Sequence, residues 1–210
     1  MHLFWIGLVF LLLEGNVTLW GTTVNLLPDA LGFLLVFVGM TKLRPQVELF
    51  SKRRLLALVF GILSLAHTVV TYALPDLSST ILFGDSIMTL ISDVVLLGKL
   101  LTIYLMTLGI AELSTVRSVD LKQKPLHVLW VLITCANIPV LGMSVVTANL
   151  YDPSYTFVKI AYIVYIIMAV ILSVLSAVMI VFAFLSARNY AKSQKKDKAK
   201  KPNRKHKKSA

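Results

Sequence analysis

The stretch LLALVFGILSLAHTVVTYAL, residues 55–74, holds 20 residues with one ionisable side chain, His67. About 20 apolar residues in helical form cross the roughly 30 Å hydrocarbon core of a bilayer. The stretch is too long for a strand and too evenly apolar for a helix on the surface of a soluble protein. It therefore predicts a transmembrane helix.

The chain as a whole has the composition of a membrane protein. Hydrophobic residues make up 57% of its 210 residues and charged residues 15%, against about 45–50% and 25% in globular domains. Three further apolar stretches are long enough to cross a bilayer. The sequence thus predicts an all-α membrane protein with four transmembrane helices, at about 55–74, 87–113, 126–147 and 160–185.

The first 43 residues leave two arrangements open. Two full spans at 2–22 and 25–43 could be joined by a tight turn, or two short helices at 3–13 and 29–42 could form a re-entrant hairpin. The residues between the short helices are rich in glycine and in β-branched side chains, which form poor helix. This composition favours the re-entrant hairpin. Its irregular backbone would then need cover from protein or from a water-filled cavity.

A motif opens the second short helix. Asn25 through Leu43 reads N-L-L-P-D-x-x-G-x-x-L-x-x-x-G-x-x-x-L. It resembles the N-terminal signature of uncharacterised small multi-pass membrane proteins of bacteria, and the similarity extends to the basic run that ends at Arg54. The resemblance implies a bacterial cytoplasmic membrane and implies no activity.

The net charge of +11 is concentrated at the C-terminus. Residues 188–210 hold 11 of the 21 Lys and Arg residues and one acid, which is +10 of the total. A Lys-rich segment of low complexity predicts disorder, so we expect a membrane domain at 1–187 and a disordered basic tail at 188–210. Beside a membrane such a tail binds anionic lipid headgroups, which accounts for the charge without a nucleic-acid partner. The tail residues assigned to lipid are Lys195, Lys196, Lys200, Lys201, Arg204, Lys205, Lys207 and Lys208.

Lysine and arginine also predict the orientation. The segments 42–54 and 114–125, together with the tail, hold 19 of the 21 basic residues, whereas 74–80 and 148–155 hold none. Basic connections stay in the cytoplasm. The C-terminus is therefore predicted to be cytoplasmic, in a multi-pass protein of the cell membrane.

Several polar side chains lie within the predicted membrane domain, where a charge at a helix centre costs about 2.5–3.5 kcal/mol. This cost makes each of them a candidate for an intramembrane site. The candidates are Asp29, Asp93, Lys99, Asn137, His67 and Glu14.

Several of the candidates also have a purely structural interpretation. Asp29 follows Pro28 in the first turn of a helix, where a carboxylate is favourable. Lys99 could extend its ammonium outward to the interface. Asp93 and Lys99 are six positions apart and cannot pair along one helix, so each needs a partner on another helix or in water. His67 could serve only helix packing.

Three features of the last two predicted helices have structural interpretations. Asn137 precedes Pro139, which predicts a kink. Ala169, Ser173 and Ala177 recur every four residues, which predicts a packing seam and not a site. Cys135 stands alone in an apolar run, so it predicts neither a disulfide nor a thiolate metal site and is expected to be a small buried residue.

Enzyme motifs are missing from the sequence. It contains no H-E-x-x-H, G-x-S-x-G, Walker A, G-x-G-x-x-G or C-x-x-C pattern. We therefore expect no catalytic residues, cofactor or metal. The leading hypothesis is an interaction, regulatory or assembly component with a membrane protein partner or a second copy of itself. The alternative is a small transporter, channel or export component for an ion, a proton or a small solute, although small size and the lack of an internal repeat weigh against a self-sufficient transporter.

Overall fold

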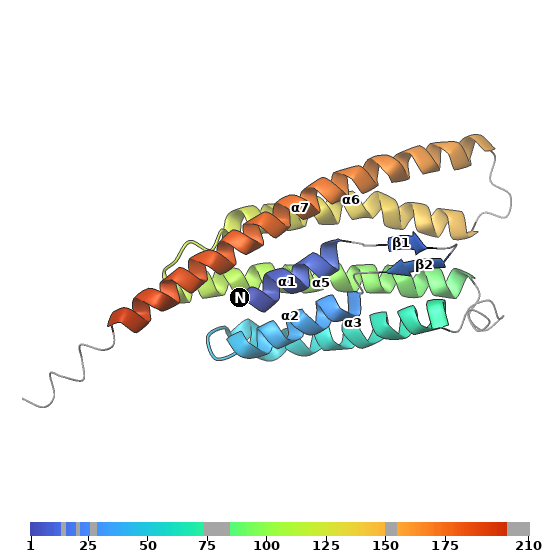
Figure 1. The fold of residues 1–210 in the computed structure, drawn as a ribbon. Coiled ribbons are helices and arrows are strands. Elements are labelled where there is room, and N and C mark those ends of the chain that lie inside the picture. Colours follow the sequence, from blue (N-terminus) through green and yellow to red (C-terminus); the bar gives the residue numbers. More distant parts are fainter. Residues whose placement is uncertain (14–15, 20–21, 26–28, 74–84, 150–154, 201–210) are drawn as a thin grey trace, which may run out of the picture.

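The fold is seen in a computed structural model that describes the chain except for residues 14–15, 20–21, 26–28, 74–84, 150–154 and 201–210. The described residues form helices and one pair of short strands (Figure 1): α1 (His2–Leu12), β1 (Asn16–Leu19), β2 (Thr22–Asn25), α2 (Asp29–Leu43), α3 (Glu48–Ala73), α5 (Asp85–Arg117), α6 (Gln123–Asn149) and α7 (Tyr155–Lys200). Helices α3, α5, α6 and α7 are long and apolar enough to cross a membrane. The prediction of an all-α, multi-pass membrane protein with four spans is confirmed.

The long helices extend beyond the predicted spans. Helix α3 begins at Glu48 and α5 ends at Arg117, because a helix can continue through polar residues once it leaves the hydrocarbon. The start of α3 is fixed from α5, since the backbone N–H groups of Glu48 and Leu49 donate to the carboxylate of Glu112 at 2.7 and 3.4 Å. Glu112 thereby satisfies two of the donors that a helix start leaves unpaired.

The N-terminal helices agree closely with the predicted pair at 3–13 and 29–42. Helix α1 ends at Leu12 and α2 begins at Asp29, so two continuous helical spans across 2–22 and 25–43 are excluded. At about 1.5 Å per residue, the 11 residues of α1 extend about 16 Å and the 15 residues of α2 about 22 Å. Neither helix matches the roughly 30 Å of a hydrocarbon core.

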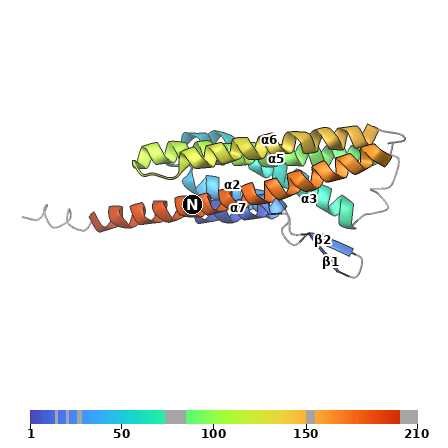
Figure 2. The same cartoon turned by 90° about the horizontal axis from the view of Figure 1, so that it is seen from above.

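The connection between α1 and α2 is more regular than the sequence predicts. Strands β1 and β2 pair antiparallel, with Asn16 opposite Asn25 and Leu19 opposite Thr22. The β-branched residues that disfavour helix in this segment favour strand, and the pairing satisfies backbone groups locally. Figure 2 shows the hairpin to one side of the long helices.

Glycine allows α1 and α2 to pack closely. Gly7 lies against Val36, and Gly32 lies against Leu11. The contacts run in opposite order along the two helices, so the pair is antiparallel, and Met1 lies near the end of α2. Gly32 belongs to the N-terminal motif, and helix contact explains the glycine at this position.

Helices α3 and α5 approach each other in the same way. A Cβ added at Gly109 would overlap the ring of Phe50, and one added at Gly98 would overlap the ring of Phe60. Phe50 is 1% exposed and cannot easily move away. Helix α5 is the most enclosed of the four spans, since 61% of its apolar window is buried against 11–28% in the others.

Helix α7 corrects the prediction that disorder begins at residue 188. It is one helix of 46 residues that continues to Lys200 (Figure 1), or about 69 Å at 1.5 Å per residue. The extension is ordered because it contacts other parts of the chain: Asn189 Nδ2 donates to the carbonyl of Asp120 at 3.0 Å, and Asp197 pairs with Arg117 at 2.8 Å. Residues 201–210 lie outside the described part of the chain.

The close contact at Gly109 generates the first prediction. Gly109→Ala should lower the free energy of unfolding by about 1–3 kcal/mol, because the added methyl group overpacks a rigid ring. Gly142→Ala is the matched control, since nothing lies within 4 Å of a Cβ at Gly142 in α6, and it should be neutral or stabilising by up to about 1 kcal/mol. Thermal unfolding in detergent measures both. Equal stability of the two variants would contradict the close contact between Gly109 and the Phe50 ring.

Candidate functional site

A buried ion pair joins two of the predicted site residues. The Nζ atom of Lys99 lies 2.8 Å from Oδ2 of Asp29, and their side chains are 9% and 18% exposed. The two residues are far apart in sequence and belong to α5 and α2. Lys99 therefore does not extend outward to the interface, as one interpretation of the sequence allowed. Instead, Lys99 pairs with a residue on another helix, as the sequence required if its ammonium stayed inside the membrane domain.

His67 brings a third helix to this pair. It is half-buried on α3, where burial is the larger influence on its imidazole and the carboxylate of Asp29 the smaller one. Helices α2, α3 and α5 have Leu43, Glu48 and Arg117 at the same end of the molecule (Figure 1). Glu48 contacts Glu112 of α5, so Leu43, Glu48 and Glu112 lie near one level. Counted from there at about 1.5 Å per residue, Asp29 and Lys99 lie about 21 and 20 Å along their helices, and His67 lies about 28 Å along its helix. His67 is therefore about 8 Å beyond the ion pair along the helix axes.

An aromatic contact holds these three helices together next to the ion pair. Phe60 of α3 packs against Gly98 of α5, and its ring lies 6.2 Å from the ring of Phe33 on α2. Phe33 is one turn from Asp29, and Gly98 precedes Lys99. The same packing that joins the helices thus places the two charges against each other.

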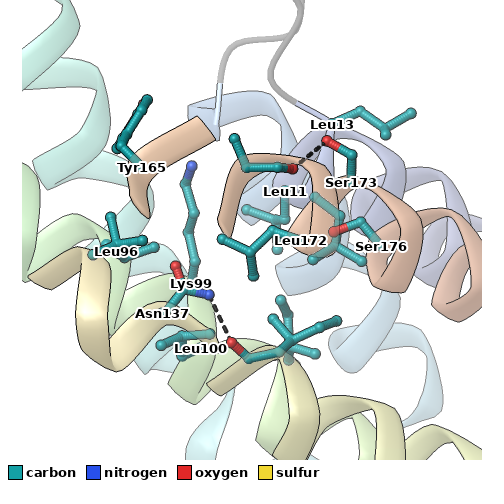
Figure 3. A pocket seen from close by; sticks show the side chains of 15 residues that line it. Leu11, Leu13, Leu96, Lys99, Leu100, Asn137, Tyr165, Leu172, Ser173 and Ser176 are labelled. Atoms are coloured by element: carbon teal, nitrogen blue, oxygen red, sulfur yellow. Dashed lines mark hydrogen bonds between the residues drawn. The ribbon is translucent and has the colours of Figure 1, made fainter. Parts of the chain in front are cut away.

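A cavity of about 400 Å³ lies beside Lys99, between α5, α6, α7 and the end of α1. Figure 3 shows Lys99 and Asn137 on one side of it, with Ser173 and Ser176 of α7 across from them. Its size is within the usual range for sites that bind small molecules. The lining residues are Leu11, Leu12, Leu13, Leu96, Lys99, Leu100, Ile103, Ile133, Asn137, Val140, Tyr165, Ala169, Leu172, Ser173 and Ser176.

Asn137 supplies an amide to the cavity. It is 6% exposed, and its Nδ2 donates to the backbone carbonyl of Ile133 at 2.8 Å. An amide also has a second N–H and a carbonyl oxygen, which that bond does not use. Asn137 is thus built into the wall, with hydrogen-bonding capacity beyond its own helix.

Sequence reasoning assigned Ser173 to a packing seam, and this was wrong. Ser173 and Ala169 both line the cavity, and the Ser173 hydroxyl donates to the carbonyl of Ala169 at 2.7 Å. Ser176 and Tyr165, which also line it, were not singled out. Small residues spaced by four place a row of short side chains on one face of a helix. The same row can face a neighbouring helix or a cavity, so the pattern alone could not separate the two.

The remaining candidates are not brought to this site. Asp93 is half-buried on α5 and does not line the cavity, and Glu14 lies outside the described residues. Cys135, expected to be buried, is exposed on α6. Lys195 and Lys196 are exposed on α7. The other tail residues assigned to lipid have side chains outside the described part of the structure.

A second polar cluster lies where α7 passes the ends of the other helices. Arg117 donates to Gln46 Oε1 at 3.1 and 2.8 Å and pairs with Asp197 at 2.8 Å. Tyr190 donates to the same Gln46 oxygen at 3.1 Å, and the Arg117 guanidinium lies over its ring. We call Gln46, Arg117, Tyr190 and Asp197 the C-terminal clasp.

The connection between α5 and α6 lies beside this clasp. Lys122 Nζ lies 2.6 Å from Asp120 Oδ2. This hydrogen bond holds the pKa of Asp120 below its ordinary value. Within the clasp Tyr190 is buried and Gln46 is half-buried, whereas the side chains of Lys122 and Asp120 are 37% and 67% exposed.

The ion pair generates the second prediction. Lys99→Met and Asp29→Asn should each lower the free energy of unfolding by about 3–5 kcal/mol, because each leaves one buried charge without its partner. The double variant should lose much less than the sum. Unfolding in detergent gives the coupling between the two substitutions.

The control for this cycle is Lys52→Met. It removes an ion pair with Glu48 whose side chains are 71% and 75% exposed, and it should leave the unfolding midpoint unchanged. Additive losses at Asp29 and Lys99 would show that the two charges do not interact.

No family model, curated protein or solved structure matches the chain. The resemblance of Asn25–Leu43 to small bacterial membrane proteins therefore stays a prediction. Function is inferred from the ion pair, the cavity and the helices that carry them.

Proposed function

We propose that this protein binds a small polar solute in the cavity beside Lys99 and carries it across the bacterial cytoplasmic membrane, alone or as a subunit of a larger transporter. The observation that supports this most directly is the contact of the cavity with a buried ion pair: Lys99 both lines the cavity and pairs with Asp29 at 2.8 Å. Charged groups placed between membrane helices mark ion and solute pathways.

The energetics favour a functional role for the pair. A buried ion pair is often no more stabilising than well-packed apolar residues of similar volume. A protein that used its helices only for packing would gain little from an aspartate and a lysine at this depth. The pair is also adjacent to empty space, where a ligand can reach one of its members.

An interaction or assembly component remains the competing hypothesis. Its support is the small size of the chain and its polybasic end. That hypothesis needs no cavity, and it gives no reason for Lys99, Asn137, Ser173 and Ser176 to surround one. The geometry therefore favours transport.

The N-terminal pair fits a re-entrant hairpin. Helices α1 and α2 are each shorter than a bilayer core, and they pack antiparallel beside the end of the molecule where α2 leads into α3. Residues Lys42, Arg44, Lys52, Arg53 and Arg54 gather at that end, which makes it the cytoplasmic side under the positive-inside rule. Lys195 and Lys196 on the α7 extension then face anionic headgroups on the same side.

The orientation generates the third prediction. In a Cys135→Ser background, Lys122→Cys should react with an impermeant maleimide only after the cells are permeabilised, because the connection that holds it is cytoplasmic. Ser78→Cys, at a position outside the described residues, should react in intact cells. The reverse pattern would invert the proposed topology.

The transport function generates the fourth prediction. Proteoliposomes of the purified protein should take up at least one of three radiolabelled probes faster than protein-free liposomes: benzenesulfonate, benzyltrimethylammonium or xylitol. Ser173→Trp should reduce that uptake at least about tenfold, because the indole fills the cavity and a loss of about 1.4 kcal/mol of binding free energy is tenfold in affinity. Val181→Trp is the matched control, since Val181 is exposed on the same helix, and its uptake should equal that of the wild type.

If all three probes enter the proteoliposomes no faster than they enter protein-free liposomes, the proposed transport function is wrong. The interaction hypothesis would then be tested by isolating the protein from detergent extracts and identifying whatever copurifies in stoichiometric amount.

A further inference from the structure

We propose that the solute is a small anion with an apolar body, and that it binds together with one proton accepted by Asp29. This inference rests on the proposed function, because it assigns the substrate class and the charge balance of the same cavity.

The lining of the cavity points to an anion. Among the 15 lining residues the one charged side chain is that of Lys99, and none is acidic. Asn137, Tyr165 and Ser176 add groups that can donate hydrogen bonds, whereas the Ser173 hydroxyl donates to the carbonyl of Ala169. Most of the other lining residues are leucine, isoleucine and valine, which suit an apolar body. A carboxylate, sulfonate or phosphate oxygen at Lys99 would form a charge-assisted hydrogen bond.

The ion pair explains why a proton must accompany the anion. Lys99 is already neutralised by Asp29, so an anion bound to Lys99 would leave one uncompensated negative charge between the helices. Such a charge is strongly unfavourable where water is scarce. If Asp29 accepts a proton as the anion takes over Lys99, the site gains one negative and one positive charge and remains neutral. No covalent bond forms or breaks, and release of the anion returns the proton.

Asp29 is the proton acceptor that the geometry favours. Among the described residues, the titratable side chains that face it are Lys99 from α5 and His67 from α3. Helix α1, which also packs on α2, presents Leu11 near this level. Of these groups, Asp29 is the one from which the Lys99 ammonium is drawn away when the anion binds. A carboxylate that loses a neighbouring cation becomes easier to protonate. His67 is the second possible acceptor.

Three probes with the same apolar ring separate the charge classes. Benzenesulfonate, benzyltrimethylammonium and benzyl alcohol are titrated into the purified protein in detergent, and binding is measured by calorimetry. We expect benzenesulfonate to bind at least about tenfold more tightly than either of the others. Lys99→Met should weaken it at least about tenfold, because a hydrogen bond to a charged group is lost.

The proton is measured directly in the wild-type protein, so the test does not depend on any variant folding. Benzenesulfonate stays ionised at all pH values used, so pH dependence reports the protein. We expect about one proton taken up per bound anion in weakly buffered solution. The dissociation constant should then rise up to tenfold per pH unit, in the range between the pKa of Asp29 in the free and in the occupied protein. At a pH low enough to keep Lys99 protonated in the variant, Asp29→Asn should bind the anion with no proton uptake, whereas His67→Gln should keep the uptake of the wild type.

The outcomes separate this inference from the proposed function. If benzyl alcohol or benzyltrimethylammonium binds more tightly than benzenesulfonate, and Ser173→Trp abolishes that binding, the assignment of an anionic solute is wrong. The proposal of a solute site in the cavity would then still stand. Anion binding without proton uptake, or uptake that His67→Gln abolishes, would overturn the role of Asp29. Absence of both binding and proteoliposome uptake for every probe would overturn the proposed function as well.

Discussion

The first backbone N–H groups of a helix have no partner within that helix, and this constraint governs the centre of the molecule. Helix α2 begins at Asp29, far from the turn that joins it to α3. A carboxylate in the first turn suits the positive end of the helix dipole, but it places a negative charge among apolar side chains. Lys99 balances that charge at 2.8 Å. The enclosed position of α5, the close approach at Gly98 and the ring of Phe60 all serve to hold the lysine there.

Much of this architecture could be predicted from the sequence, because hydrocarbon thickness restricts what a long apolar run can do. The four spans, the short helices at either side of the N-terminal connection and the cost of placing Asp29 and Lys99 among apolar side chains all follow from that restriction. Their pairing could not be predicted. Helical periodicity shows which residues share a face of α5, but it does not show that α2 rather than α6 lies opposite that face.

Two of the errors of prediction have a common physical cause. The basic segment after residue 187 has the composition of a disordered tail, yet Tyr190 and Asp197 have partners at Gln46 and Arg117, and these contacts keep α7 helical. Ser173 has the spacing of a packing residue, yet it faces a cavity. In both cases composition and spacing describe the segment alone, whereas its neighbours in space determine its state.

The continuity of α7 has a mechanical consequence. Its inward face, defined by the spacing of Leu172, Ser176, Met179, Ala183, Ala187 and Tyr190, runs without a break from the cavity to the C-terminal clasp. A helix without proline or a bulge resists twisting, since its hydrogen bonds fix each turn relative to the next. Rotation of α7 at Ser176 therefore turns Tyr190 and Asp197 by a similar angle against Gln46 and Arg117. A change in the orientation of α7 beside the cavity would therefore also change the contacts of the C-terminal clasp.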